Sequence, residues 1–252
     1  MCPLIKVSSP PPSPRESPGT SWRGQFFFGE TCAVYRGEAS ENARHAHAAI
    51  QIALSVGAPV CIETDCSLVS GNALVIRPMV AHALVASGPV VLVYVEARSA
   101  LARALLERVG SAGVEPLPGD LLTEFSFNEV PDAWLGRFAS RLRPPARGLD
   151  PRLASVLDRL ATKSGAMTVA DATAESGLSG SRLRTLAQEQ LGVSIATWLV
   201  WRKLERAARK LASGSSLAEA AMAGGFSDQA HFARAMRRMF GVTPRIASRT
   251  LR

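Results

Sequence analysis

The sequence lacks the features that identify secreted, disulfide-bonded and membrane-spanning proteins. Its four cysteines show no Cys-x-x-Cys spacing, which favours reduced thiols over a disulfide framework. The first residues contain no apolar segment of the kind that secretory signals need. The most apolar window, 79–95, is interrupted by a histidine and a Gly-Pro pair, and it is too short to cross a bilayer. We therefore expect a soluble cytoplasmic protein with no membrane partner. The cysteines are Cys2, Cys32, Cys61 and Cys66.

The first part of the chain also lacks net charge. Residues 1–148 contain 13 Lys and Arg against 13 Asp and Glu, whereas residues 149–252 contain 16 against 8. The whole excess of +8 therefore lies in the C-terminal part, a distribution typical of a module that binds a polyanion. The length of 252 residues allows about two domains.

The most informative stretch is 225–244, whose pattern predicts the second helix of a helix-turn-helix. Gly225 can adopt a positive φ in the turn, and Ser227 or Asp228 can cap the helix that follows. Apolar residues recur at helical spacing up to Gly241, which is expected to end the helix, and Pro244 is expected to prevent it from resuming directly. The apolar face is formed by Phe232, Met236, Met239 and Phe240.

The segment GGFSDQAHFARAMRRMFGVTP resembles the signature of the AraC/XylS family of bacterial transcription regulators. The resemblance covers about 150–245 in detail and about 37–108 loosely. It implies an α+β multidomain fold, with an N-terminal cupin-like β-barrel and trailing helices, then an all-α domain with two helix-turn-helix units joined by a long helix. The expected parts are a disordered tail at 1–21, an effector-binding and dimerisation domain at 22–140, a linker at 141–149 and a DNA-binding domain at 150–252.

Local patterns agree with this division. Five prolines lie between Ser8 and Ser21, which favours an extended or disordered tail. Seven short apolar runs between residues 25 and 95 have strand length and are separated by turn residues, as in a barrel or sandwich. Helical patterns follow at 97–110 and 130–142, which are expected either to form the dimer surface or to cover the barrel. Further helices are expected at 151–161, 168–175, 179–191, 195–212 and 217–223.

Three of the four histidines occur in segments that resemble the two cupin motifs, the second within ALVIRPMVAHAL. Two imidazoles at i and i+2 of one strand would share a face and could join a third from an opposite strand, as a Zn, Fe or Mn site needs. The alternative is a metal-free effector pocket with hydrogen-bonded histidines. Gln51 replaces the Glu of metal-binding cupins, and Met79 stands where Gly is usual. The expected pocket is His45, His47, Gln51 and His82, and the ligands expected for a divalent metal, if the pocket holds one, are His45, His47 and His82.

Matching the base-contacting positions of the family implies a set of residues for reading DNA. Arg184 and Arg234 could each bind guanine through two hydrogen bonds, and Gln229 could pair with adenine. Nearby arginines are expected to contact phosphates, which position a protein without reading sequence. The implied base contacts are Ser181, Arg184, Thr185, Gln229, Ala230, Ala233 and Arg234. The expected phosphate contacts are Arg182, Arg202, Arg237 and Arg238.

Some residues depart from the family pattern. Ala187 stands where a core Phe is common, and Ala220 and Gly224 replace larger aliphatic residues. Smaller side chains at such positions would leave the helical cores less filled, at a cost of about 1 kcal/mol or more for each missing group. We expect either compensating bulk from elsewhere or a marginally stable domain.

The leading hypothesis is a non-enzymatic, sequence-specific transcription regulator whose promoter binding is modulated by a small effector in the N-terminal barrel. Its expected partners are double-stranded DNA, the effector, a second copy of the chain and, if it acts as an activator, RNA polymerase. Two alternatives are a cupin metalloenzyme fused to a DNA-binding domain and a dimeric DNA-binding protein that needs no effector.

Overall fold

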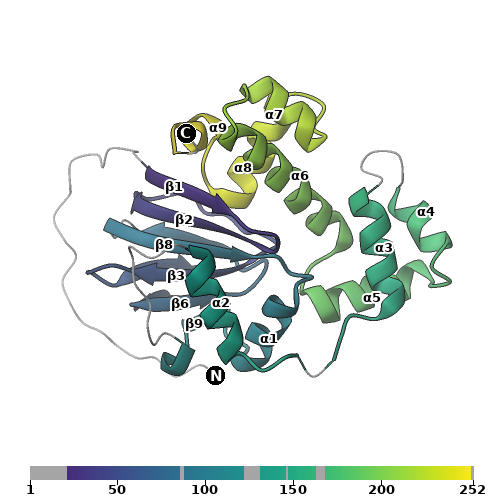
Figure 1. The fold of residues 1–252 in the computed structure, drawn as a ribbon, viewed down its shortest axis with the longest axis horizontal. Helices are drawn as coiled ribbons and strands as arrows, with labels where there is room; N and C mark the ends of the chain where they lie inside the picture. The colour runs from purple at the N-terminus through teal and green to yellow at the C-terminus, as the bar shows by residue number, and fades with distance from the viewer. Residues whose placement is uncertain (1–21, 86–87, 122–130, 146, 163–167, 251–252) are drawn as a thin grey trace.

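The computed structural model describes residues 22–85, 88–121, 131–145, 147–162 and 168–250. The predicted tail at 1–21 lies outside the described residues. The N-terminal half folds into antiparallel strands, followed by helices that occupy the rest of the chain (Figure 1). The strands are β1 (Arg23–Phe28), β2 (Cys32–Ala39), β3 (Ile50–Ser55), β4 (Val60–Thr64), β5 (Leu68–Gly71), β6 (Ala73–Ile76), β7 (His82–Val85), β8 (Gly88–Val95) and β9 (Val114–Pro116).

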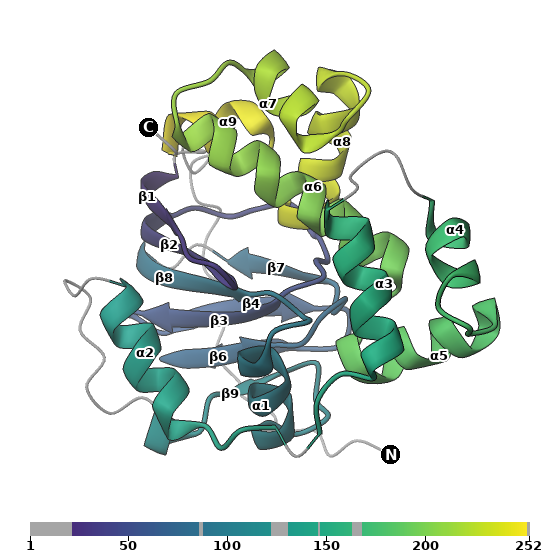
Figure 2. The same ribbon diagram turned by 45° about the vertical axis from the view of Figure 1, so that its right-hand side comes forward.

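The strands form two sheets and not a closed barrel. One sheet has six strands in the order β1-β2-β8-β3-β6-β9, and the other has three in the order β5-β4-β7. The small sheet lies behind the large one in Figure 2. The α+β class is therefore as predicted, but the barrel is open, because the described ladders join strands only within each sheet apart from one bridge between His45 and His82.

Two helices cover the outer face of the large sheet. They are α1 (Ala100–Arg108) and α2 (Pro131–Arg141), and a short 3-10 turn, η1 (Gly119–Leu121), lies between them. Trp134 and Phe138 of α2 stack at a ring distance of 5.0 Å and belong to the same buried cluster as Ile52 and Val93 of the sheet. The apolar faces of these helices thus cover the sheet, which was one of the two predicted roles.

Burial on both faces explains why β3 and β8 have nearly continuous apolar sequences. Side chains alternate along a strand. In β8, Val91 and Val93 face the helices, whereas Leu92 and Tyr94 face the interior between the sheets. Gln51 of β3 is the register partner of Tyr94 and is itself buried. A polar side chain is therefore placed within the interior of the sheet region.

The C-terminal part contains two helix-turn-helix units around one long helix (Figure 1). Ser, Thr or Asp side chains cap five of these helices by accepting a hydrogen bond from the first turn. Their ends agree with the predicted ones to within about two residues. The helices are α3 (Pro151–Thr162), α4 (Val169–Ala174), α5 (Gly180–Leu191), α6 (Ile195–Ala212), α7 (Leu217–Gly224), α8 (Gln229–Phe240) and α9 (Pro244–Thr250).

The structure agrees that α8 ends before Gly241 and does not resume directly, but the helix that follows was not predicted. Helix α9 begins at Pro244 itself. The first position of a helix needs no backbone N–H donor and suits the fixed φ of proline. The strands β5 and β9 were also missed, since their sequences, LVSG and VEP, contain only two and one apolar aliphatic residues.

The helical part packs directly against the sheets. One buried cluster includes Tyr35 and Leu92 of the sheets together with Leu157, Leu186 and Trp198 of the helices around the first helix-turn-helix. A second cluster forms the core of α6, α7 and α8. No described helix is long and apolar enough to cross a membrane.

Gly224 does not leave the core of the second unit underfilled. A Cβ there would lie 2.8 Å from the Lys203 carbonyl oxygen and 2.9 Å from the ring of Phe226. Helix α7 thus approaches α6 so closely that only glycine fits, and Phe226, 5.3 Å from Phe232, supplies the bulk. Of the two predicted alternatives, the structure therefore shows compensating bulk from elsewhere at this position.

Candidate functional site

The first candidate DNA-reading helix is α5. Its start is capped by Ser179, whose hydroxyl accepts a hydrogen bond from the Arg182 N–H at 3.2 Å. Ser181, Arg184 and Thr185 are all exposed on its outer face. The other side of the helix carries Leu183, Leu186, Ala187 and Leu191, which are buried. The structure therefore presents the three expected base-contacting side chains together on one solvent-facing surface.

The second candidate reading helix is α8. Asp228 caps it, with a carboxylate oxygen 2.6 Å from the His231 N–H donor, and this hydrogen bond lowers the pKa of Asp228. Gln229, Ala230 and Arg234 are exposed, whereas Ala233 is half-buried. The opposite face is buried as predicted from the apolar spacing. The four expected base-contacting residues thus lie near the N-terminal half of α8.

The expected phosphate contacts are placed less uniformly. Arg182, Arg237 and Arg238 are exposed, and no carboxylate of the described residues forms an ion pair with them. Arg202 is half-buried, and its guanidinium is 2.6 Å from a Glu205 carboxylate oxygen. An arginine already paired within α6 is poorly available to a phosphate, so the structure does not favour this role for Arg202.

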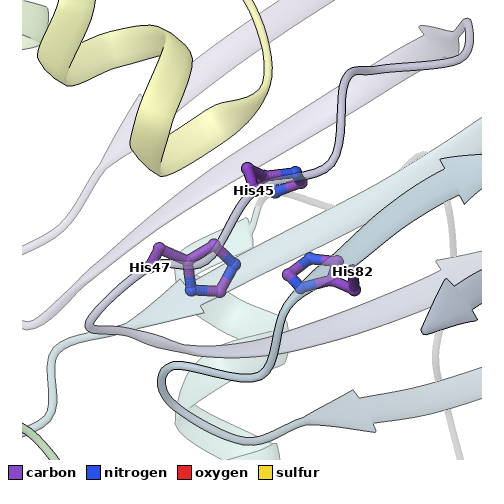
Figure 3. Close-up of side chains that lie close together, drawn as sticks. All are labelled: His45, His47 and His82. Carbon is purple, nitrogen blue, oxygen red and sulfur yellow. The ribbon is translucent and has the colours of Figure 1, made fainter. Parts of the chain in front are cut away.

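The three predicted pocket histidines converge. His45 and His47 lie on the loop before β3, and His82 begins β7; all three rings face one another (Figure 3). A ring nitrogen of each lies within 4.8 Å of those of the others. Only a single bridge, not a regular strand, carries His45, so the expectation that two of them share a strand is wrong although the convergence holds.

Gln51 belongs to the same cluster. Its Oε1 lies 2.7 Å from Nε2 of His47 and 3.2 Å from Nε2 of His82. The turn before His82 is held by a hydrogen bond of 2.9 Å from the Met79 N–H to the His47 carbonyl. Met79 has a φ of 63°, a conformation that glycine adopts most easily. This accounts for the glycine that is usual at this position in the cupin motif.

Burial keeps the three rings uncharged. It lowers the pKa of His45 to about 2 and that of His82 to about 3, with repulsion between the neighbouring rings as a further cause. Burial also lowers the pKa of His47, although the Gln51 Oε1 beside its Nε2 opposes the shift. Neutral imidazoles are the form that donates a lone pair to a metal or accepts a hydrogen bond.

An apolar pocket lies beside the histidines, where the sheet meets the helices. It encloses about 720 Å³ of empty space, part of which is open to solvent. Its charged lining residue is Glu205, which is paired with Arg202 and Arg209. Its lining includes Phe26 and Phe28 of β1, Tyr94 of β8, Trp201 and Glu205 of α6 and Phe240 of α8. The histidines do not line this pocket.

The end of α8 is attached to the loop that carries the histidines. The ring of His47 is 6.1 Å from that of Trp201 and 6.4 Å from that of Phe240. A movement of the histidine loop or of the pocket lining would therefore act directly on α8. The hydrogen bonds are Asn42 Nδ2 to the Phe240 carbonyl (3.2 Å), Ala43 N to the Gly241 carbonyl (3.1 Å) and Ala46 N to the Arg238 carbonyl (3.3 Å).

The sequence reasoning missed the aromatic residues of this junction. Neither Trp198 nor Trp201 was predicted to contact the sheets. The available signal was that two of the four tryptophans lie three residues apart in one helix, hence on one side of it. Such a pair indicates a face that packs against another part of the chain.

Comparisons with known proteins agree with this architecture. Residues 172–249 match a family model described as a helix-turn-helix domain. No curated protein matches the chain. Among solved structures, apo ToxT from Vibrio cholerae strain SCE256 superposes with a TM-score of 0.59 at 10% identity, covering 89% of this chain and 99% of that chain.

A second ToxT structure, from Vibrio cholerae O395, is bound to (E)-4-(8-methylnaphthalen-1-yl)but-3-enoic acid and has a TM-score of 0.59 at 11% identity, covering 88% of this chain and 100% of that one. ToxT bound to an unsaturated fatty acid gives a TM-score of 0.57 at 10% identity, covering 88% and 96%. At such identities the likeness shows the fold. The chain therefore carries a helix-turn-helix domain at 172–249 within the fold that ToxT also has.

Proposed function

We propose that this protein is a sequence-specific DNA-binding regulator of transcription whose promoter binding is modulated by a small apolar effector. The observation that carries the proposal is the pair of helices, α5 and α8, that expose polar and basic side chains from two helix-turn-helix units. A helix fits the major groove, where each base pair presents a distinct pattern of donors and acceptors.

The two reading helices are proposed to enter successive major grooves on one side of the duplex. Each unit is packed against α6, so the helices are held at a fixed separation. Arg184 and Arg234 are the proposed guanine contacts, and Gln229 the proposed adenine contact. Arg182, Arg237 and Arg238 are proposed to contact phosphates.

The proposed effector site is the apolar pocket between β1, α6 and α8, in place of the histidine cluster. The lining supports an apolar ligand, since it is dominated by aromatic and aliphatic side chains. A protein of similar fold also supports an apolar ligand, because ToxT has been solved with an unsaturated fatty acid bound. A ligand that fills this space would contact α8 through Phe240 and Met236, and so could shift the second reading helix.

DNA recognition can be tested by selecting bound fragments from sheared genomic DNA with the purified full-length chain. We expect enriched sites with two conserved elements about 10 bp apart, protected on one side of the duplex in hydroxyl-radical footprints. Enrichment of no sequence, with protection spread evenly, would instead support a DNA-binding protein that lacks sequence preference.

The effector site can be tested through intrinsic tryptophan fluorescence, since Trp22 and Trp201 line the pocket, in titrations with an unsaturated fatty acid, its methyl ester and a neutral naphthalene. Ala208 lines the pocket from α6, so Ala208→Phe should fill it and abolish the response. Ala212 is exposed at the end of the same helix, and Ala212→Phe is the matched control. A response that survives Ala208→Phe would place the ligand elsewhere.

Dimerisation and activation through RNA polymerase belong to the same proposal. Light scattering of the full-length chain with and without promoter DNA tests the first, and transcription from a selected promoter tests the second. The proposed role is regulatory and not catalytic, and metabolite turnover by the purified chain would overturn that part.

A further inference from the structure

The histidine cluster contains a tautomer pattern that points to a ligand. A backbone carbonyl oxygen only accepts hydrogen bonds, so a ring nitrogen that faces one carries the proton. All three Nδ1 atoms face a carbonyl in this way, and each ring is therefore protonated at Nδ1. The distances are 3.0 Å from His45 to Ala43, 2.9 Å from His47 to Ala49 and 2.9 Å from His82 to Val80.

The Nε2 atoms consequently carry unprotonated lone pairs within a buried space. Gln51 directs Oε1 toward two of them, at 2.7 Å from His47 and 3.2 Å from His82. An amide oxygen and an imidazole lone pair are both acceptors and repel each other without a cation or proton between them.

A rotated Gln51 amide would resolve only part of this conflict. Its NH2 group could then donate to His47 and His82. His45 would still have no donor at Nε2, because its one described hydrogen bond uses Nδ1. A single cation between the rings satisfies all three lone pairs and the amide oxygen together.

We propose that His45, His47 and His82, with Gln51 Oε1 as a fourth ligand, bind one divalent transition-metal ion. Imidazole nitrogen suits Zn²⁺, Co²⁺, Ni²⁺ and Fe²⁺, and the Nδ1 hydrogen bonds are the outer contacts that orient metal-binding histidines. The four donors carry no negative charge, so the affinity is expected to be moderate.

The spacing fits such an ion after a small contraction. Tetrahedral zinc, with Zn–N bonds of about 2.0–2.1 Å, places its nitrogens roughly 3.3 Å apart, and the ring nitrogens here lie within 4.8 Å of one another. Two of the ligands are on a loop before β3 and one begins β7. Closing these segments by about 1.5 Å would bring the nitrogens to the bonding separation.

The ion would lie close to the C-terminal end of α8. His47 contacts Trp201 and Phe240, and its loop is hydrogen-bonded to the end of α8. Coordination would therefore stiffen the attachment of α8 to the sheets. The site does not depend on the proposed function, because metal binding can be measured without DNA or effector.

The test uses the full-length chain without a histidine tag, stripped with a chelator and titrated with Co²⁺. We expect one Co²⁺ per chain, with visible absorption bands typical of nitrogen ligation, and one Zn²⁺ that displaces it. His82→Ala should weaken binding at least tenfold. His231 is outside the cluster, and His231→Ala is the matched control that should bind as the wild type does.

Gln51→Glu provides a second variant with an opposite prediction. A carboxylate ligand should raise the affinity for Zn²⁺ at least tenfold if Gln51 coordinates the ion. If the amide only donates hydrogen bonds, the same variant should destabilise the chain and gain no metal. Absence of stoichiometric Co²⁺ and Zn²⁺ in the wild type, or binding unchanged in His82→Ala, would overturn the proposal. Circular dichroism identifies variants that fail to fold, in which case the Gln51→Glu comparison decides.

Discussion

The indole N–H of Trp198 donates a hydrogen bond of 3.0 Å to the carboxylate of Glu96, joining the long connecting helix α6 to the residue that follows β8 of the large sheet. Both side chains are buried. Glu96 also lies 3.5 Å from Arg98, which pairs with Asp158 of α3. One small polar network therefore ties the first helix-turn-helix unit to the sheets.

Replacing Glu96 should loosen this junction. Glu96→Ala leaves a buried indole N–H without an acceptor, so the free energy of unfolding should fall by about 1–3 kcal/mol. Glu96→Gln retains an oxygen that can accept and should cost less. Urea unfolding followed by tryptophan fluorescence measures both. Glu63 is exposed on β4, and a loss for Glu63→Ala equal to that for Glu96→Ala would contradict the role of the hydrogen bond.

The close approach of α7 to α6 leads to a second prediction, about the stability of a Gly224 variant. Gly224→Ala should destabilise the chain by about 1–3 kcal/mol, because its Cβ would overlap the Lys203 carbonyl oxygen. Gly136 is exposed in α2, and a Cβ there would meet nothing within 4 Å. Gly136→Ala should therefore be neutral or stabilising, by up to about 1 kcal/mol. Thermal unfolding of the two variants distinguishes a packing effect from helix propensity, and equal shifts would contradict the packing argument.

Much of the secondary structure could be predicted because local signals were consistent. Seven strands and the helices up to α8 follow apolar periodicity, and residues such as Asp228 and Gly241 mark helix ends by their own chemistry. Helix α9 was missed because Pro244 was interpreted as a stop when it serves as a start. The strands β5 and β9 are too short for a periodic signal.

Tertiary features were predictable only in part. The convergence of the histidines followed from the cupin resemblance, but the open arrangement of the sheets and the pocket beside Trp201 depend on contacts between distant segments. Gly224 illustrates the difference. The family pattern suggests a missing side chain there, whereas the distance to the Lys203 carbonyl shows that α6 occupies the space.

The buried histidines predict that metal-free protein loses stability in acid. The folded-state pKa values of about 2 for His45 and about 3 for His82 lie below the unfolded value of about 6.5. As the pH falls below that unfolded value, the unfolded chain binds protons that the folded chain excludes. The free energy of unfolding should therefore decrease toward acid pH, by roughly 1–2 kcal/mol per ring between pH 7 and pH 5.

Urea unfolding at pH 7, 6 and 5 in the presence of a chelator measures this dependence. His82→Asn should reduce the dependence of the free energy of unfolding on pH. His231 lies outside the buried cluster, so His231→Asn should leave most of this dependence unchanged. A free energy of unfolding that does not change between pH 7 and pH 5 would show that the rings can be protonated without cost.

The exposed arginines of α8 predict two different effects on DNA binding. Arg234 is exposed one turn after Ala230 in α8, so Arg234→Ala should cost about 1–3 kcal/mol at the preferred site and relax the preference at one base pair. Arg238 is a proposed phosphate contact, and Arg238→Ala should weaken binding to all sequences about equally. It should also reduce the dependence of log K on log salt by about one unit. Fluorescence anisotropy with the selected site, single-base variants and unrelated DNA, each at several salt concentrations, measures these effects. If both variants lose discrimination at the same base pair, the division into base and phosphate contacts is wrong.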